Sequence, residues 1–177
     1  GERGFEIFAT AEHVTELWDK ILENGKSIGI MPCSFTCLDK IRVEAGLLFY
    51  PYDMSEDNSV WEVGLDWAMS KKGENYRGKA AAMALKDKEK IKVVGIDVAH
   101  GEALVGGEKL LLEESEIGVV NSPVFSHRLG KSLALAHVTP EASIPGTLLR
   151  VEGEGISCAA TVALIPFHDP EKKHTHS

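Results

Sequence analysis

The order of hydrophobic and polar residues changes character near residue 86 of this chain. Before that point, apolar residues recur at the spacing of one helix face between residues 10 and 26. The members of this stripe are Val14, Leu17, Trp18, Ile21 and Leu22. The pattern predicts a helix over 10–26, which Thr10 would cap and Gly25 would end.

Two further helices are expected in the same half. The stretch 34–46 carries an apolar face and offers Ser34 as its N-cap and Gly46 as its stop. The alanine-rich stretch 75–85 predicts a short helix. Before all of these, "GERGFEIF" alternates apolar and polar residues, which predicts a strand from about residue 4.

Beyond the charged run "KDKEK" at 86–90, the chain is a series of short β segments separated by Gly, Pro, Asn or Ser. They cover 91–98, 109–114, 117–126, 132–138, 147–153 and 156–166. Short strands at such spacing predict an antiparallel barrel or a sandwich. The glycine-rich stretch 101–108 is interpreted as a hairpin turn, because it lacks the strand–turn–helix context of a phosphate loop.

Composition narrows the classes of partner. The 177 residues carry 19 Lys and Arg against 27 Asp and Glu, a formal net charge of −8. This acidic balance argues against a nucleic-acid partner, which would require a broad basic surface. No apolar run approaches the roughly 20 residues that cross a bilayer, so no membrane partner is expected. Three cysteines favour a reducing compartment, and a cytoplasmic location is expected.

Few residues suggest metal or nucleophilic chemistry. Cys33 and Cys37 lie one helical turn apart, but a structural zinc site needs four ligands, so two ordinary thiols are the better interpretation. His174 and His176 could chelate a metal, but a solvated tail is the default for "HDPEKKHTHS". The remaining histidines show no triad pattern. No catalytic or metal-binding residue is therefore predicted.

Glu6 is the most informative polar residue. A carboxylate within a predicted strand needs either solvent or hydrogen-bond donors. If it faces a pocket, it can accept two hydrogen bonds from the N–H edge of a heterocycle. The alternative is that Glu6 points to solvent.

Several segments together resemble the aminomethyltransferase, or glycine cleavage T-protein, family of folate-dependent one-carbon enzymes. "GERGFEIF" is similar to the family pattern G-E-x-G-[YF]-E-[IL], and "LDKIRVEAGLLFYPYDM" to its R-D-x-L-R-L-E-A-G-L segment. "GVVNSPVFSHRLGKSLALAHV" is similar to a segment of the family's barrel, and "IPFHDPE" to its closing P-F-Y-D-P. The order and spacing of these motifs carry the resemblance.

The resemblance implies a fold and a division into domains. We expect the α+β class: a partial α/β sandwich that belongs to the folate-binding region, followed by a small antiparallel β-barrel. The expected boundaries are 1–86 for the first part and 87–170 for the barrel, with a loose tail at 171–177. The chain would correspond to the C-terminal portion of a family member and begin within its second domain.

The resemblance also implies site residues and a cofactor. Tetrahydrofolate is the expected cofactor, with Glu6, Arg42 and Tyr50 as its binding residues. Glu6 matches the family's pterin-binding glutamate. Leu38 stands where the family has a folate-contacting arginine, and a leucine cannot pair with an anionic folate tail. Arg42, one turn later, could project nearby. Glu62 matches a recurrent family position that could as easily be structural.

The expected function is transfer of a one-carbon unit from a small amine or sulfonium donor to folate, as in the glycine cleavage T-protein, with a lipoyl carrier protein as a further partner. The acidic residue for this transfer would lie in the preceding half, so we expect little activity from this chain alone. One alternative is a folate-dependent demethylase or the folate domain of an oxidase. Another is a non-catalytic binding module that could dimerise through an exposed edge.

Overall fold

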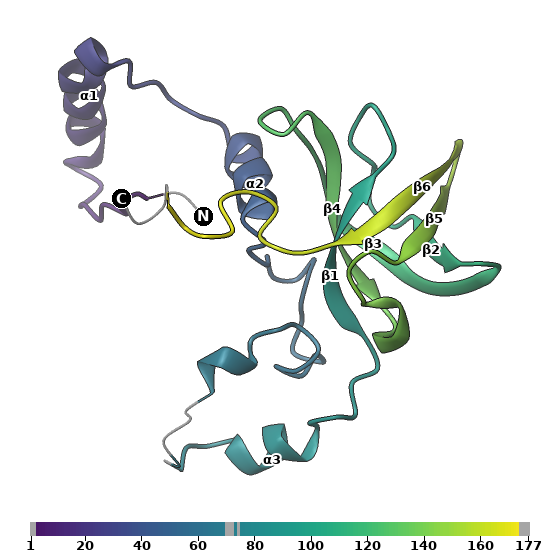
Figure 1. The fold of residues 1–177 in the computed structure, drawn as a ribbon. Helices are drawn as coiled ribbons and strands as arrows, with labels where there is room; N and C mark the ends of the chain where they lie inside the picture. Colours follow the sequence, from purple (N-terminus) through teal and green to yellow (C-terminus); the bar gives the residue numbers. More distant parts are fainter. Residues whose placement is uncertain (1–2, 70–72, 74, 174–177) are drawn as a thin grey trace.

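The computed structural model describes residues 3–69, 73, 75–173 and shows a β-barrel with helices beside it (Figure 1). The helices are α1 (Val14–Gly25), α2 (Phe35–Glu44) and α3 (Lys79–Ala84), with short 3₁₀ turns η1 (Lys26–Ile28), η2 (Asp66–Ala68) and η3 (Pro140–Ala142). The strands are β1 (Lys92–Val98), β2 (Lys109–Leu112), β3 (Ser115–Ser126), β4 (Lys131–Val138), β5 (Leu148–Gly153) and β6 (Ile156–Ala163).

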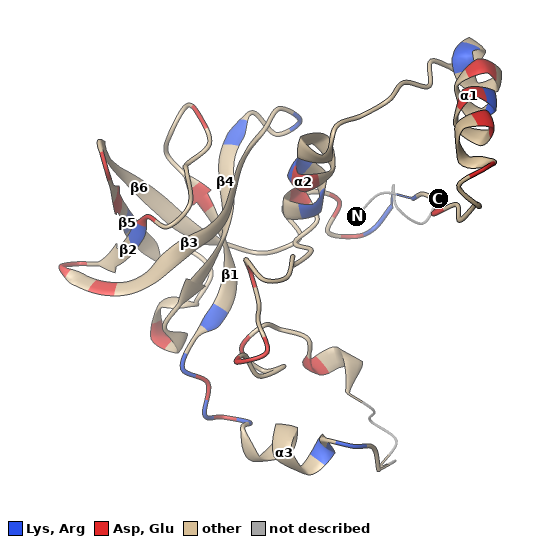
Figure 2. Ribbon diagram, turned by 180° about the vertical axis from the view of Figure 1, so that it is seen from behind, with Lys and Arg blue, Asp and Glu red and all other residues tan. Residues whose placement is uncertain are grey.

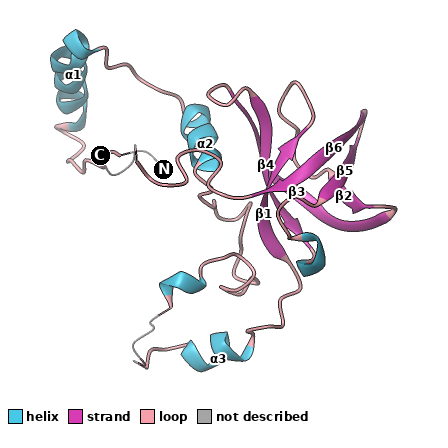
Figure 3. Ribbon diagram, in the orientation of Figure 1, coloured by secondary structure: helices cyan, strands magenta, loops and turns pink. Residues whose placement is uncertain are grey.

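The six strands close into one antiparallel barrel in the order β1-β4-β3-β2-β5-β6. Each of the six predicted β segments forms a strand. Figure 3 shows these strands in magenta and the helices in cyan. The α+β class and the small antiparallel barrel are thus confirmed. Because β1 and β2 are not neighbours, the stretch 101–108 belongs to a connection between separated strands. Its interpretation as a hairpin turn is wrong.

Strand β4 is buried on both faces, and its residue sizes show why. Ala134 and Ala136 face the barrel interior, where they join the main core with residues of the other strands. Leu133 and Leu135 point the other way and pack against Val43 of α2. Small residues inside and larger ones outside let α2 cover the barrel wall without leaving a void.

The predicted ends of α2 are confirmed. The Ser34 hydroxyl accepts a hydrogen bond from the Cys37 N–H at 3.3 Å, as an N-cap does. Gly46, just after the helix, has a φ of +66°, a conformation that L side chains rarely adopt. The helix therefore ends here, and the chain leaves α2 at Gly46.

Helix α1 forms as expected but begins later than the sequence suggested. Its N-cap is His13, and no side chain caps the helix. Thr10 instead uses its backbone carbonyl to accept the N–H groups of His13 and Val14, at 3.0 and 3.1 Å. The prediction of Thr10 as the capping side chain is wrong. The helix ends at Gly25, as expected, and continues into η1.

The strand predicted near residue 4 does not form. Residues 3–10 have no strand pairing, and the side chains of Phe5 and Phe8 are about nine-tenths exposed. An alternating pattern marks a segment that can pair, but a strand exists only when a neighbour supplies its hydrogen bonds. No strand among the described residues lies beside this segment, and Figure 1 shows α1 standing away from the barrel.

Candidate functional site

A cavity of ≈ 330 Å³ opens where α2, the segment 47–53, strand β3 and the connection between β1 and β2 meet. Its size is within the range of small-molecule sites. Both aromatic and polar side chains line it, and they come from parts of the chain far apart in sequence. The lining residues are Phe35, Asp39, Arg42, Phe49, Tyr52, Leu104, Val105, Asn121, Ser122 and Pro123.

An irregularity in β3 holds the segment 47–53 against the barrel. The register between β3 and β4 shifts at Asn121, so this residue lacks a ladder partner. Its side-chain amide donates to the Tyr52 carbonyl at 2.9 Å, and its side-chain oxygen accepts the His137 N–H at 2.8 Å. Through the bulge, the Asn121 side chain holds the segment 47–53, one wall of the cavity, against the barrel.

Arg42 links α2, the following segment and the barrel. Nε donates to Asp39 at 2.7 Å, and Nη2 donates to the Ser122 hydroxyl at 2.8 Å. Nη1 donates to the Leu47 carbonyl at 3.2 Å and forms an ion pair with Asp53. Four of its five N–H donors are therefore engaged within the chain.

Helix α2, the segment 47–53 and the barrel meet at a contact that we call the seam. Asp53 is the charged residue buried most deeply there. Its side chain is fully buried, and one carboxylate oxygen accepts both Arg42 and the Phe49 N–H. The other oxygen has no hydrogen-bond partner among the described residues. The Asp53 carbonyl lies 2.8 Å from His137 Nε2, which places the donor hydrogen of that ring on Nε2. Two carboxylates, Asp39 and Asp53, therefore surround one guanidinium.

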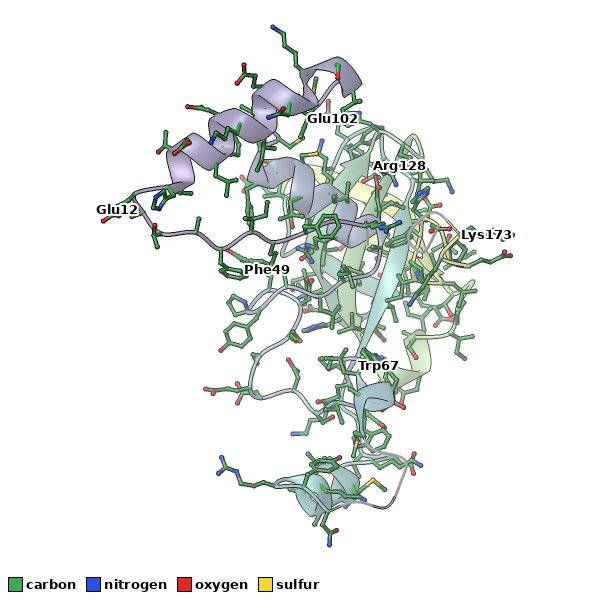
Figure 4. All side chains as sticks on the ribbon, turned by 90° about the vertical axis from the view of Figure 1, so that its left-hand side faces the viewer. Glu12, Phe49, Trp67, Glu102, Arg128 and Lys173 are labelled. Carbon is green, nitrogen blue, oxygen red and sulfur yellow. The ribbon has the colours of Figure 1, made fainter. Side chains whose placement is uncertain are left out.

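The aromatic side of the cavity is continuous. The rings of Phe49 and Tyr52 stack with centroids 5.9 Å apart, and Phe35 meets Phe49 edge to face at 6.0 Å. The Arg42 guanidinium lies 5.6 Å from the Phe49 centroid. Figure 4 labels Phe49 on the segment that follows α2. These rings form an aromatic wall, defined here as Phe35, Phe49 and Tyr52.

The structure does not bring the three predicted binding residues together. Arg42 lines the cavity, whereas Tyr50 lies on the same segment with 58% of its surface exposed and does not line it. Glu6 is exposed on the segment before α1. Leu38 lies half-exposed on α2. That Glu6, Arg42 and Tyr50 contact folate stays a prediction.

Sequence reasoning missed Asp39, Asn121 and Ser122 as parts of this site. Asp39 offered one signal, because it follows Leu38 within the segment already singled out. Asn121 and Ser122 offered none, because a strand pattern does not reveal a bulge or a contact with Arg42, 80 residues earlier.

Glu62 has a structural set of contacts outside the cavity. Its carboxylate accepts the N–H groups of Ser59 at 2.8 Å and Lys90 at 3.0 Å. Burial alone raises the pKa of Glu62, but these hydrogen bonds outweigh that effect and hold its pKa below the ordinary value. Its carbonyl also accepts the Val93 N–H at 2.9 Å. Glu62 thus fastens the first part of the chain to β1.

Metal and thiol chemistry receive no support from the described part of the chain. No three His, Cys, Asp or Glu side chains gather there closely enough to hold a metal ion. Cys33 and Cys37 are free and exposed. Burial, with a smaller contribution from Glu108, raises the pKa of the Cys158 thiol. His174 and His176 lie outside the described residues.

No described helix is long and apolar enough to span a bilayer.

Comparison with known proteins identifies the family. Residues 1–73 match the model of the GCVT N-terminal domain, and residues 92–169 match that of the glycine cleavage T-protein C-terminal barrel domain. This chain belongs to the glycine cleavage T-protein, or aminomethyltransferase, family. The second match covers all six strands of the barrel.

Among curated relatives in this family, the gamma subunit of a heme-dependent oxidative N-demethylase from Ectopseudomonas mendocina is 40% identical over 98% of this chain and 48% of the relative. An aminomethyltransferase from Thermotoga neapolitana is 34% identical over 95% of this chain and 46% of the relative. The chain thus spans about half the length of the curated relatives it matches. The aminomethyltransferase T of Bartonella henselae shares the fold, with a TM-score of 0.80, 24% identity, and coverage of 88% of this chain and 44% of that chain.

Proposed function

We propose that the protein containing this chain binds tetrahydrofolate and loads it with a one-carbon unit derived from an N-methylated amine. In this proposal a partner subunit passes two electrons from the N-methyl group to an oxidant such as O₂, which brings the carbon to the formaldehyde level, and the demethylated amine is released. This is the demethylase alternative raised by the sequence. The observation that carries the choice of donor is the greater identity to the N-demethylase gamma subunit, 40% against 34% for the aminomethyltransferase. Leu38, in place of the arginine that the family resemblance implies, also favours altered ligand contacts.

The residues of this chain fit one part of tetrahydrofolate and not the other. The exposed Glu6 carboxylate can accept two N–H groups from the neutral edge of a pterin ring. At the position of the family's arginine the anionic tail finds no cation, because Leu38 is apolar, and Arg42 one turn later already serves two carboxylates. When bound, tetrahydrofolate supplies the nitrogens that accept the carbon; in this proposal the chain orients the ring through Glu6.

The experiment compares donors in the full-length protein together with its natural partner subunits. With an N-methylated amine, tetrahydrofolate and O₂ as the two-electron oxidant, we expect 5,10-methylenetetrahydrofolate and the demethylated amine to accumulate, measured by chromatography, and no such folate product when the oxidant is withheld. If formaldehyde is released at the same rate and amount with or without tetrahydrofolate, and no methylene derivative forms, the proposal is wrong.

The second candidate function is glycine cleavage of the T-protein type. Its support is the match to aminomethyltransferases over most of this chain. The same protein would then release ammonia from an aminomethylated lipoyl carrier protein in a folate-dependent manner. Turnover of that carrier, without turnover of N-methylated amines, would select this candidate. We expect the 177 residues alone to show neither activity. The cytoplasmic location of the protein stays a prediction.

A further inference from the structure

The charges around the cavity disfavour anionic ligands. The charged side chains that line it are Asp39 and Arg42, and Arg42 is also paired with the buried Asp53. Two carboxylates against one guanidinium give this cluster a net negative charge. An anion would meet that charge with one remaining N–H of Arg42 as its donor, so the cavity favours a neutral or cationic ligand.

Asp39 leaves an acceptor available at the cavity. One of its carboxylate oxygens receives Arg42 Nε at 2.7 Å, and the other makes no hydrogen bond within the described residues. The side chain is 38% exposed, so a ligand can reach it. An ammonium N–H placed here would form a charge-assisted hydrogen bond.

The aromatic wall favours a cation that also carries methyl groups. Phe35 and Tyr52 expose about two-thirds of their surface, and Phe49 already accepts a cation, the Arg42 guanidinium, over its ring. Aromatic faces attract positive charge, and methyl groups on nitrogen present that charge on an apolar surface. A cavity of ≈ 330 Å³ has room for such a group together with several waters.

We propose that this cavity binds a small methylated ammonium ion, with N–H donation to Asp39 and methyl contact with the aromatic wall. The inference rests on the proposed function and deepens it, because it assigns the amine to a place in this chain. Ser122 and Asp53 act through Arg42 in this arrangement, since they hold its guanidinium and so fix the position of Asp39.

The test measures binding of dimethylammonium to the full-length protein by ligand-observed NMR, without folate. We expect saturable binding with a dissociation constant on the order of millimolar, as suits a ligand of three heavy atoms. Trimethylammonium should compete with dimethylammonium for the cavity. Acetate, an anion of similar size, should not compete, and tert-butanol should compete weakly. Stronger competition by acetate than by trimethylammonium would overturn the proposal.

Two variants separate the carboxylate from the aromatic wall. Asp39→Asn keeps an oxygen for Arg42 but removes the charge, and we expect about tenfold weaker binding. Tyr52→Ala removes one ring, and we expect roughly two- to fivefold weaker binding. The matched controls Asp57→Asn and Tyr76→Ala change residues that do not line the cavity and should bind as the unmodified protein does.

The outcomes distinguish this site from the proposed function. If dimethylammonium binds and both cavity variants weaken it while no folate product forms, the site stands and the function is wrong. If folate product forms from the amine but neither variant changes the amine's dissociation constant or KM, the function stands and the site is wrong. Failure of dimethylammonium to bind saturably overturns the site in either case.

Discussion

The barrel and the segment before it differ in how they satisfy the same two demands, burial of apolar side chains and pairing of backbone groups. Among the described residues, all the buried hydrophobic ones except Val43 and Val63 lie between residues 94 and 162. In the described part of residues 3–91, large apolar side chains such as Trp18, Ile28 and Met31 are exposed. The barrel closes on itself, so its hydrogen bonds need no other segment, whereas α1 contacts little beyond η1. Local pattern therefore suffices for the barrel and not for the first part.

Charge follows the same division. Figure 2 shows both signs of charge along α1, where Lys20 and Glu16 pair at 2.5 Å with 64% and 61% of their side chains exposed. At the seam, Arg42 and Asp53 pair with little or no exposure. An exposed pair contributes little, because water screens it, but a buried charge that loses its partner is costly.

The largest effect is therefore expected from Arg42→Met. The variant leaves Asp53 buried without its cation and should lower the free energy of unfolding by about 3–5 kcal/mol. Equilibrium urea denaturation, followed by tryptophan fluorescence, measures the change. Lys20→Met removes the cation of the exposed pair on α1 and should cost at most about 0.5 kcal/mol. Equal losses for the two variants would contradict the comparison.

Leucines of the barrel provide the next test. Leu110 is fully buried in the main core, whereas Leu148 on β5 is 72% exposed. Leu110→Ala should destabilise the chain by about 2–5 kcal/mol, because it leaves a cavity in a closed barrel. Leu148→Ala should change stability by no more than about 0.5 kcal/mol. Thermal unfolding of both variants checks the difference, and a Leu110→Ala chain as stable as Leu148→Ala would show that the core is not the barrel interior.

The same contrast explains what the sequence predicted well. The six β segments alternate or run apolar between turn residues, and each is paired within the chain, so pattern and structure agree. The stretch 4–10 has an equally good alternation, but pairing depends on a neighbour that the pattern does not specify. The hairpin interpretation of 101–108 was wrong for a related reason, because the order of strands in the barrel is not their order in sequence.

The candidate site was predictable only in part. Arg42 was singled out from its own segment, but its role depends on Asp53 and Ser122, which lie 11 and 80 residues away. The bulge at Asn121 has no composition signal of its own. A site assembled by long-range contacts requires the closed barrel before its members can be recognised.

Substitution of a glycine tests how closely the neighbouring strands β3 and β4 approach each other. A Cβ added to Gly118 on β3 would lie 2.0 Å from the His137 carbonyl oxygen, a backbone atom that cannot move alone. Gly118→Ala should therefore destabilise the barrel by about 1–3 kcal/mol. Gly101 has open space around its Cβ position and no positive φ, so Gly101→Ala should be close to neutral. Urea midpoints give the comparison, and a neutral Gly118→Ala would mean that β3 and β4 are not paired there.

The smallest effect concerns the junction between the two regions. Hydrogen bonds hold the pKa of Glu62 below its ordinary value, so this group contributes stability above the unfolded-state pKa of about 4.3. That contribution is lost as the pH falls through the lower folded-state pKa, because the proton binds more readily to the unfolded chain. Glu62→Gln does not titrate, so its free energy of unfolding should fall less than that of the unmodified chain between pH 6 and pH 3. Denaturant titrations across this range provide the test. Parallel curves would mean that the contacts with Ser59 and Lys90 do not fasten the first part of the chain to the barrel.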